Sequence, residues 1–197
     1  MSDAPDTVRV GLVSDTHAVY DKELDTVLEN VQHILHAGDI GHKHSNPDDV
    51  LSRLSRIAPT LAVRGNVDNN ASHIPEFRLL HFGGWKVLLL HIAGMPPTTT
   101  AACLELVHLH HPDTVIFGHS HKHGVCQHNG VMYINPGSAG PARFKLARSA
   151  AILSLPVKTP TAQLSDDMVQ FCMLATKGYK NIAAKDSHSS CKRRRKE

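Results

Sequence analysis

The order of secondary-structure signals in the first third of the chain constrains the fold more than any other feature of the sequence. Three short apolar runs, residues 8–14, 34–35 and 60–63, have the composition of buried strands. Two amphipathic helical patterns lie between them. The apolar residues of these patterns are Leu24, Val27, Leu28 and Val31 behind a capping Asp21, then Val50, Leu51, Leu54 and Ile57 behind Asn46-Pro47-Asp48-Asp49. This alternation predicts a sheet that is at least partly parallel.

Hairpin signals dominate the rest of the chain. Residues 78–82 and 85–90 flank Gly83-Gly84, and residues 124–128 and 131–134 flank Asn129-Gly130, two turn types that favour tight hairpins. The remaining signals predict a helix at 99–110 and strands at 113–117, 150–155 and 168–174. Roughly ten strands are more than one sheet usually holds, so we expect two packed sheets with helices outside them.

The composition favours one globular domain followed by a tail. The chain has 197 residues, of which 41% are hydrophobic, and a net charge of +3. We expect a folded domain over residues 1–176 and a polar, flexible tail over 177–197 that carries a basic run from Lys192 to Lys196. Four dispersed cysteines, a polar N-terminus and short apolar runs predict a cytoplasmic protein with no membrane partner. The basic run is also compatible with a nuclear localisation signal.

Residues that bind metal ions follow five of the predicted strands at the point where each strand ends. They are Asp15 and His17, Asp39, Asn66, His91, and His119 with His121. The carboxyl ends of parallel strands form a common crevice, so these side chains are expected to converge. Any single one of them is also explained as an ordinary turn or strand-end residue, and the ordered set carries the prediction. Mixed Asp, Asn and His ligands suit Mn²⁺, Fe²⁺ or Zn²⁺ better than Ca²⁺.

The ordered motifs resemble those of the calcineurin-like metallophosphoesterase superfamily. They read SDTH at 14–17, GD at 38–39, GNVD at 65–68, His91, GHSH at 118–121 and NPGS at 135–138. The resemblance covers about residues 8–155 and is greatest to the compact single-domain phosphodiesterase branch, which also includes the metallophosphoesterase-fold subunit of retromer. It implies a four-layer αββα sandwich of two mixed β-sheets flanked by helices.

The resemblance also implies a reaction, the hydrolysis of a phosphodiester or phosphomonoester by a hydroxide that bridges two divalent metal ions. Mn²⁺ is the favoured metal. One ion would be held by Asp15, His17, Asp39 and His121. The other would be held by Asp39, Asn66, His91 and His119, which makes Asp39 the bridging ligand.

Two positions depart from the patterns of the family. Val67 stands where many members carry a His that protonates the leaving group, and the neighbouring Asp68 is expected to orient its loop instead. His91 is followed by Ile92 and Ala93, whereas the branch usually reads His-Gly-His. Three cations next to the motif loops are candidates for phosphate contacts, although ordinary solvated side chains explain them equally: Arg64, Arg143 and Lys145.

Two other functions are compatible with the sequence. The first is a catalytically silent interaction scaffold on the same fold, although a scaffold has no need to retain seven ligand-type residues. The second is a nuclease that uses the basic run, although the body lacks a basic groove interleaved with aromatic residues, so nucleic acid is not an expected partner. The sequence leaves the physiological substrate and homo-oligomer formation open.

Overall fold

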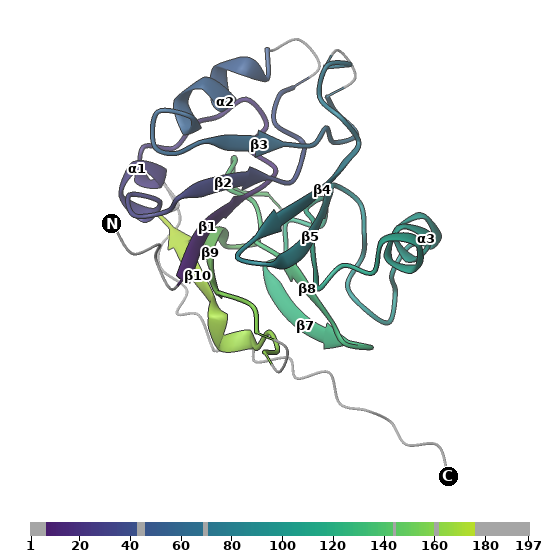
Figure 1. Cartoon of the computed structure of the whole chain (residues 1–197). Helices are drawn as coiled ribbons and strands as arrows, with labels where there is room; N and C mark the ends of the chain where they lie inside the picture. The colour runs from purple at the N-terminus through teal and green to yellow at the C-terminus, as the bar shows by residue number, and fades with distance from the viewer. Residues whose placement is uncertain (1–6, 43–45, 69–70, 144, 160–161, 176–197) are drawn as a thin grey trace.

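The protein forms two five-stranded sheets that pack face to face with three helices outside them (Figure 1). The computed structural model describes residues 7–42, 46–68, 71–143, 145–159 and 162–175. The predicted tail at 177–197 lies outside the described residues. The first sheet has the order β10-β9-β1-β2-β3 and the second has the order β4-β5-β6-β8-β7.

The strands of the first sheet are β1 (Thr7–Val13), β2 (His33–His36), β3 (Thr60–Ala62), β9 (Arg148–Pro156) and β10 (Val169–Leu174). Those of the second sheet are β4 (Phe77–Phe82), β5 (Trp85–Leu90), β6 (Thr114–Ile116), β7 (Gly124–His128) and β8 (Val131–Asn135). The helices are α1 (Glu23–Val27), α2 (Asp48–Leu54) and α3 (Ala101–His110), and a 3₁₀ turn, η1 (Asp166–Met168), precedes β10.

Three hydrophobic clusters fill the spaces between four layers. The central cluster lies between the sheets and contains Leu12, Leu153 and Trp85, whose indole N–H donates a hydrogen bond to the Pro156 carbonyl of the first sheet at 2.6 Å. A second cluster lies under α1 and α2, and a third, with Cys103 of α3, lies under that helix. Because each sheet is covered by apolar contacts on both faces, the predicted αββα sandwich is confirmed.

The parallel pairings in both sheets position the site. β1 pairs in parallel with β2, and β2 with β3. In the second sheet β5 pairs in parallel with β6, and β6 with β8. The carboxyl ends of neighbouring parallel strands therefore lie together, as the β-α-β-α-β order predicted.

The end of α1 and the start of α2 differ from the prediction. α1 ends at Val27 instead of continuing to Val31, because the chain turns early so that Gln32 can exchange hydrogen bonds with Arg9 at the start of β2. Pro47 is the residue before α2 and not its first residue, and the side chain of Asn46 accepts from the Asp48 N–H at 3.0 Å. Leu28 and Val31 still pack in the cluster beneath the helices.

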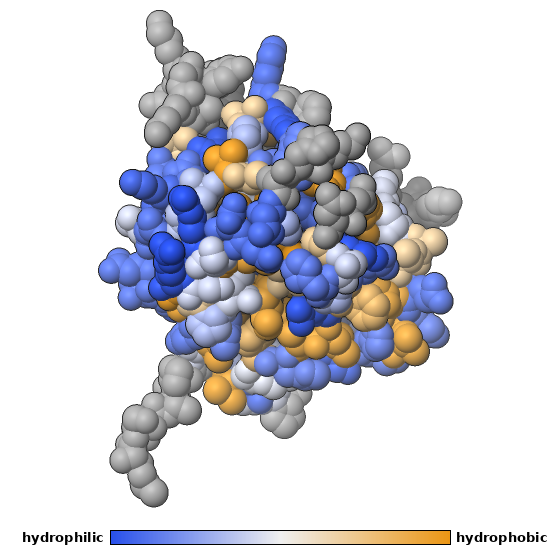
Figure 2. Space-filling model, turned by 90° about the horizontal axis from the view of Figure 1, so that it is seen from above, coloured by the Kyte–Doolittle hydropathy of each residue, from blue (hydrophilic) through white to orange (hydrophobic). Residues whose placement is uncertain are grey.

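The surface mixes hydrophilic and apolar groups. Figure 2 shows apolar side chains interspersed among hydrophilic ones on the face that it presents. Within the described ranges, none of the helices combines the length and the apolar composition needed to cross a bilayer.

Candidate metal centre

The loops that carry the predicted ligands are joined to one another by backbone hydrogen bonds. The Asp15 N–H donates to the Gly38 carbonyl and the His17 N–H donates to the Asp39 carbonyl, both at 3.0 Å. In the second sheet, the Gly118 N–H donates to the His91 carbonyl at 3.0 Å. Because β1 and β2 belong to one sheet and β5 and β6 to the other, the ligand loops meet at the seam between the sheets.

One group of ligands forms around Asp15. The Nε2 atom of His121 lies 3.2 Å from Asp15 Oδ1 and 3.2 Å from His17 Nε2. All three side chains are buried, and their ligand atoms lie within 4.8 Å of one another. This spacing is suitable for three atoms that share one cation.

A second group forms around His91. Its Nε2 atom lies 3.3 Å from Asp39 Oδ1 and 3.1 Å from Asn66 Oδ1, and the same amide oxygen is 3.0 Å from His119 Nδ1. Asp15, Asp39 and His91 also have ligand atoms within 4.8 Å of one another. The structure thus brings all seven predicted residues into one connected cluster.

The two groups share Asp15, whereas the resemblance implied Asp39 as the shared ligand. Asp15 belongs to the group with His17 and His121 and also to the group with Asp39 and His91. Asp39 nevertheless faces the first group closely enough for its charge to act on the His17 imidazole. The bridging role of Asp39 therefore stays a prediction, and Asp15 is a second carboxylate at the centre of the cluster.

Five of the seven predicted ligands have a left-handed backbone. Nine non-glycine residues in the described part have positive φ, and the five ligands among them are Asp15 (54°), His17 (48°), Asp39 (51°), His119 (69°) and His121 (56°). Such conformations are unfavourable for residues with a β-carbon, and they concentrate at functional sites. They turn the chain sharply at each strand end, so that successive side chains reach the same space.

Two glycines allow these loops to approach one another. A β-carbon on Gly118 would lie 1.9 Å from Ser14 Oγ, and one on Gly65 would lie 2.1 Å from Asp39 Oδ1. Any larger residue would displace the loop that carries a ligand. The glycines of the GNVD and GHSH motifs are therefore required by packing against the Asp39 and Asp15 loops.

The donor set fits divalent cations. Asp15 Oδ2 accepts hydrogen bonds from Ser14 Oγ at 2.6 Å and from the His119 N–H at 3.1 Å, but Asp15 Oδ1 is buried and has no hydrogen-bond donor among the described residues. A buried carboxylate oxygen without a hydrogen-bond donor is costly, and a cation would satisfy it. His91 Nδ1 donates to the Ala37 carbonyl at 2.7 Å, which fixes the ring so that Nε2 faces Asp39 and Asn66.

The electrostatics of the cluster keep Asp39 ionised. Burial alone would raise the pKa of Asp39, but the hydrogen bond and charge of His91 and the Val67 N–H outweigh it and lower the pKa. Burial lowers the pKa of His91, yet the Asp39 carboxylate raises it above its ordinary value. Burial, followed by the charge of Arg143, lowers the pKa of His17, so this imidazole is held in its neutral, metal-binding form.

Asp68 holds two of the ligand loops together. Its carboxylate accepts hydrogen bonds from the backbone N–H groups of Ile40 (3.1 Å), Gly41 (2.8 Å) and Gly65 (2.8 Å). These three hydrogen bonds fix the loop after β2 against the loop after β3. Asp68 therefore orients its loop, as the sequence suggested.

The NPGS segment supports the loops from the other side. Asn135 Nδ2 donates to the Gly118 carbonyl at 2.7 Å and to Ser120 Oγ at 3.1 Å. Ser138 Oγ donates to the Asp15 carbonyl at 2.9 Å. The sequence identified this segment as a motif but gave no role for it. Its role is to join the GHSH loop to the Asp15 loop.

His36 is a supporting residue that the sequence analysis missed. It is fully buried at the end of β2, its Nδ1 accepts from the Gly38 N–H at 3.3 Å, and its Nε2 lies 2.9 Å from Thr16 Oγ1. Thr16 Oγ1 in turn donates to the Ile40 carbonyl at 2.9 Å, so His36 Nε2 carries the proton. Burial lowers the pKa of His36 to about 4. A strand-end His beside a Gly-Asp pair is the one signal that could have identified it.

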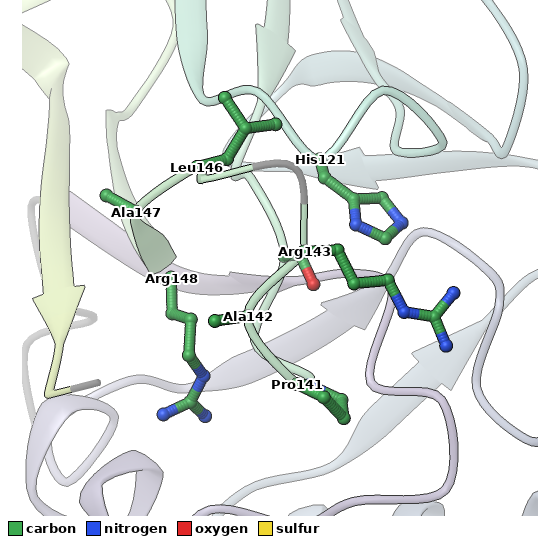
Figure 3. A pocket seen from close by; sticks show the side chains of 8 residues that line it. His121, Pro141, Ala142, Arg143, Leu146, Ala147 and Arg148 are labelled. Carbon is green, nitrogen blue, oxygen red and sulfur yellow. The ribbon is translucent and has the colours of Figure 1, made fainter. Parts of the chain in front are cut away.

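The three candidate phosphate-binding cations have different surroundings. Arg64 pairs with Glu76 and is thereby engaged. Lys145 is exposed on the loop that follows the NPGS segment. Arg143, on the same loop, lines a surface depression together with His121 (Figure 3). The sequence did not single out Arg148, which is buried and donates to the carbonyls of Gly140, Ala139 and Ala175.

A two-sheet sandwich with a cluster of Asp, Asn and His at its seam is the architecture of metal-dependent phosphoester hydrolases. The chain belongs to this class, because the calcineurin-like phosphoesterase superfamily domain matches residues 8–157. The family resemblance that the motifs indicated is therefore confirmed.

Two curated relatives and one solved structure agree with this membership. A probable metallophosphoesterase of Methanothermobacter thermautotrophicus is 31% identical over 140 residues, which cover 66% of this chain and 76% of the relative. The probable metallophosphoesterase YsnB of Bacillus subtilis is 29% identical over 165 residues, covering 81% and 91% of the two chains. The structure of vacuolar protein sorting 29 from Cryptosporidium parvum superposes with a TM-score of 0.62 at 21% identity, covering 85% of this chain and 97% of that one.

Proposed function

We propose that the protein hydrolyses phosphodiesters, using two divalent cations that are held at the seam between the sheets. The observation that carries the proposal is the connected cluster of seven Asp, Asn and His side chains, which includes Asp15 Oδ1, a buried oxygen without a hydrogen-bond donor in the described part. Membership of the calcineurin-like superfamily supports a hydrolase of phosphate esters. When bound, paired cations acidify water and stabilise the charge that develops on the phosphoryl group.

Each side chain has a defined part in this proposal. His17 and His121, with Asp15, would hold one cation, and His91, Asn66 and His119 would hold the other. Asp39 would contribute to both. The neutral imidazoles supply affinity without adding charge, and the two carboxylates offset the charge of the cations. Mn²⁺ is our favoured metal, with Fe²⁺ and Zn²⁺ as alternatives to be compared directly.

The preference for diesters with good leaving groups follows from the lack of a proton donor beside Asn66. Val67 cannot donate a proton, and both oxygens of the Asp68 carboxylate accept backbone N–H groups of the ligand loops. An alkoxide leaving group needs a proton in the transition state, whereas an aryloxide leaves without one. Activated aryl diesters are therefore the substrates on which activity should be found first.

A scaffold function on the same fold is the alternative proposal. The similarity to vacuolar protein sorting 29 extends over 85% of this chain, although at 21% identity it shows the fold alone. A scaffold would not require the buried and strained ligand cluster. The nuclease alternative depends on Lys192–Lys196, which lies outside the described residues. The free thiols of Cys103 and Cys172 are consistent with the cytoplasmic location that we propose.

Metal reconstitution of the purified full-length chain tests the proposal. The chelated protein is loaded with Mn²⁺, Fe²⁺ or Zn²⁺, its metal content is measured by elemental analysis, and it is assayed against aryl diesters, phosphomonoesters and cyclic nucleotides. We expect two ions per chain and turnover of aryl diesters. A protein that binds two ions and turns over no ester would support the scaffold. A protein that binds none would refute the metal centre.

A further inference from the structure

We propose that Arg143 binds the phosphoryl oxygens of the substrate beside the His17–His121 half of the metal cluster. This inference rests on the proposed function and deepens it by assigning a substrate contact. Three observations carry it: the anchoring of the loop, the position of the guanidinium, and the engagement of the neighbouring arginines.

The loop that carries Arg143 is anchored beside the first ligand group. Gly140 N–H donates to the Asp15 carbonyl at 3.1 Å, and Ala139 N–H donates to the Ser14 carbonyl at 3.0 Å. At the other end of the loop, Arg148 Nε and Nη2 donate to the carbonyls of Gly140 and Ala139 at 2.6 and 2.7 Å. The start of the segment that follows the NPGS motif is therefore held against the Asp15 loop, and Arg148 ties the end of the segment back to that start.

Within this loop, Arg143 lies on the side of the metal ligands. Arg143 and His121 line the same surface depression, and Figure 3 shows their side chains directed to the same side of the loop while Arg148 points away. The charge of Arg143 also reaches His17, on which it is the strongest of the charge effects. The charge of Arg143 thus acts on the first ligand group, and its side chain shares a depression with His121.

Arg143 is available for a ligand in a way that the nearby arginines are not. Arg64 pairs with Glu76, and Arg148 is occupied by three carbonyls and by Asp21 at 2.7 Å. Arg143 is exposed, and its guanidinium forms no hydrogen bond or ion pair within the described part of the chain. Asp15 and Asp39, the nearest ligand carboxylates in the cluster, are 0% and 3% exposed and do not draw it into an ion pair.

The chemistry of the guanidinium suits a phosphoryl group. Its planar fork donates two parallel hydrogen bonds to two oxygens of a phosphate, which a point charge such as lysine does not do. Phosphomonoesters, phosphodiesters and free phosphate all present such a pair of oxygens. The ligand chemistry that they share is therefore a tetrahedral phosphate next to the cations. The test below uses a diester, a monoester and orthophosphate to distinguish these three ligands.

The test compares Arg143→Gln and Arg143→Lys with the wild type in the metal-loaded, full-length protein. Orthophosphate binding is measured by calorimetry, and kcat and KM are measured for bis(4-nitrophenyl) phosphate and for 4-nitrophenyl phosphate. We expect Arg143→Gln to weaken orthophosphate binding and to raise KM by about 10-fold to 100-fold, the effect of losing charge-assisted hydrogen bonds. Arg143→Lys should recover only part of the loss, and metal content should not change.

Two further variants control for a general loss of positive charge, as opposed to the loss of a specific contact with phosphate. Lys145→Gln removes a charge two residues away on the same loop, and Arg56→Gln removes an exposed charge beyond α2. Both should change orthophosphate binding by less than about 2-fold, since exposed charges are screened. If Lys145→Gln weakens binding as much as Arg143→Gln, or if Arg143→Gln binds orthophosphate like the wild type, the assignment is overturned.

The measurement of orthophosphate binding distinguishes a failure of this inference from a failure of the proposed function. If the wild type hydrolyses esters and Arg143→Gln has unchanged kinetics and binding, the inference fails while the function stands. If the wild type hydrolyses no ester, the function fails, and a loss of orthophosphate binding in Arg143→Gln still supports the phosphate contact. A loss that appears only for the diester or only for the monoester shows which ester Arg143 binds.

Discussion

The backbone N–H of His119 donates a hydrogen bond to Asp15 Oδ2 at 3.1 Å, across 104 residues of sequence. It joins the loop after β6 in one sheet to the loop after β1 in the other. With Ser14 Oγ as a second donor at 2.6 Å, it orients the carboxylate so that Oδ1 faces His121. The geometry of the metal cluster therefore depends on contacts between the sheets as well as on the ligands themselves.

Replacing Asp39 with alanine tests which carboxylate bridges the cations. If Asp39 serves both ions, Asp39→Ala should lose most of both and nearly all activity while the chain stays folded. Elemental analysis and circular dichroism of the purified variant measure the two outcomes. Asp49→Asn, an exposed acid in the first turn of α2, is the control and should keep two ions.

Elemental analysis of Asp15→Ala distinguishes a bridging Asp39 from a bridging Asp15. Asp15 belongs to both groups of ligand atoms. If Asp39→Ala retains two ions and Asp15→Ala retains none, the bridging assignment passes from Asp39 to Asp15.

His36 should make the metal-free protein sensitive to acid. Its pKa is lowered by burial to about 4 in the folded state, against about 6.5 in an unfolded chain. The unfolded state therefore binds more protons between pH 6.5 and pH 4, and the free energy of unfolding falls as the pH falls through this window. The full effect is on the order of 3 kcal/mol. Above pH 6.5 His36 is neutral in both states and contributes no pH dependence.

His36→Gln isolates this contribution, because glutamine keeps an N–H donor for Thr16 and does not titrate. Urea unfolding of the chelated proteins between pH 4.5 and 7.5 should give a shallower pH slope for His36→Gln than for the wild type. His81→Gln, exposed on β4, should keep the wild-type slope. Equal slopes for all three proteins would show that His36 does not control the acid response.

The lack of a proton donor at Val67 should appear in the dependence on the leaving group. General acid catalysis typically contributes 10²- to 10⁴-fold, and most for poor leaving groups. We expect kcat/KM for aryl and alkyl diesters to fall steeply as the pKa of the leaving group rises. Val67→His should flatten this dependence, whereas Val67→Asn, which is polar but not acidic, should not. A flat dependence in the wild type, with chemistry rate-limiting, would reveal another general acid.

The folded domain should end close to residue 176. The last described residue, Ala175, donates its N–H to Glu23 at 2.7 Å and accepts from Arg148 Nη1 at 2.8 Å. A chain that ends at Thr176 keeps both contacts, so its melting temperature and its turnover of aryl esters should match those of the full chain. A chain that ends at Met173 loses them and should melt at a lower temperature. If the first truncation lowers either property substantially, residues 177–197 contribute to the domain.

The fold was predictable because its signals are local. The apolar runs before Asp15, Asp39 and His119 are strands in the structure, and the turns at Gly83-Gly84 and Asn129-Gly130 form the two hairpins. The ends of α1 were not predictable, because the chain turns after Val27 to satisfy a contact with Arg9 that no local pattern contains. Helix length here depends on tertiary structure more than on propensity.

The difference between local signals and contacts that are distant in sequence also applies to the site. The convergence of the seven candidate ligands could be predicted, because each of them follows a strand. The residues that hold them were harder to predict, because their partners are distant in sequence: Asn135 supports Gly118, and His36 contacts Thr16. Which of Arg64, Arg143 and Arg148 is available to bind a phosphate depends on the groups that surround each of them in the fold. The sequence places Arg64 next to a motif, but only the fold brings Glu76 to it.

The position of the ligand cluster at the seam has a consequence for how the domain responds to metal. Each group combines carboxylates from the β1–β2 side with an imidazole from the β5–β6 side, so a bound cation links the same two sheets that Leu12, Trp85 and Leu153 hold together. Binding and inter-sheet packing are then thermodynamically linked. A cation at 100 times its dissociation constant adds about 2.7 kcal/mol to the free energy of unfolding. A cavity made between the sheets, far from any ligand, lowers the apparent affinity for the cation only as far as it populates the unfolded chain, which lacks the assembled site.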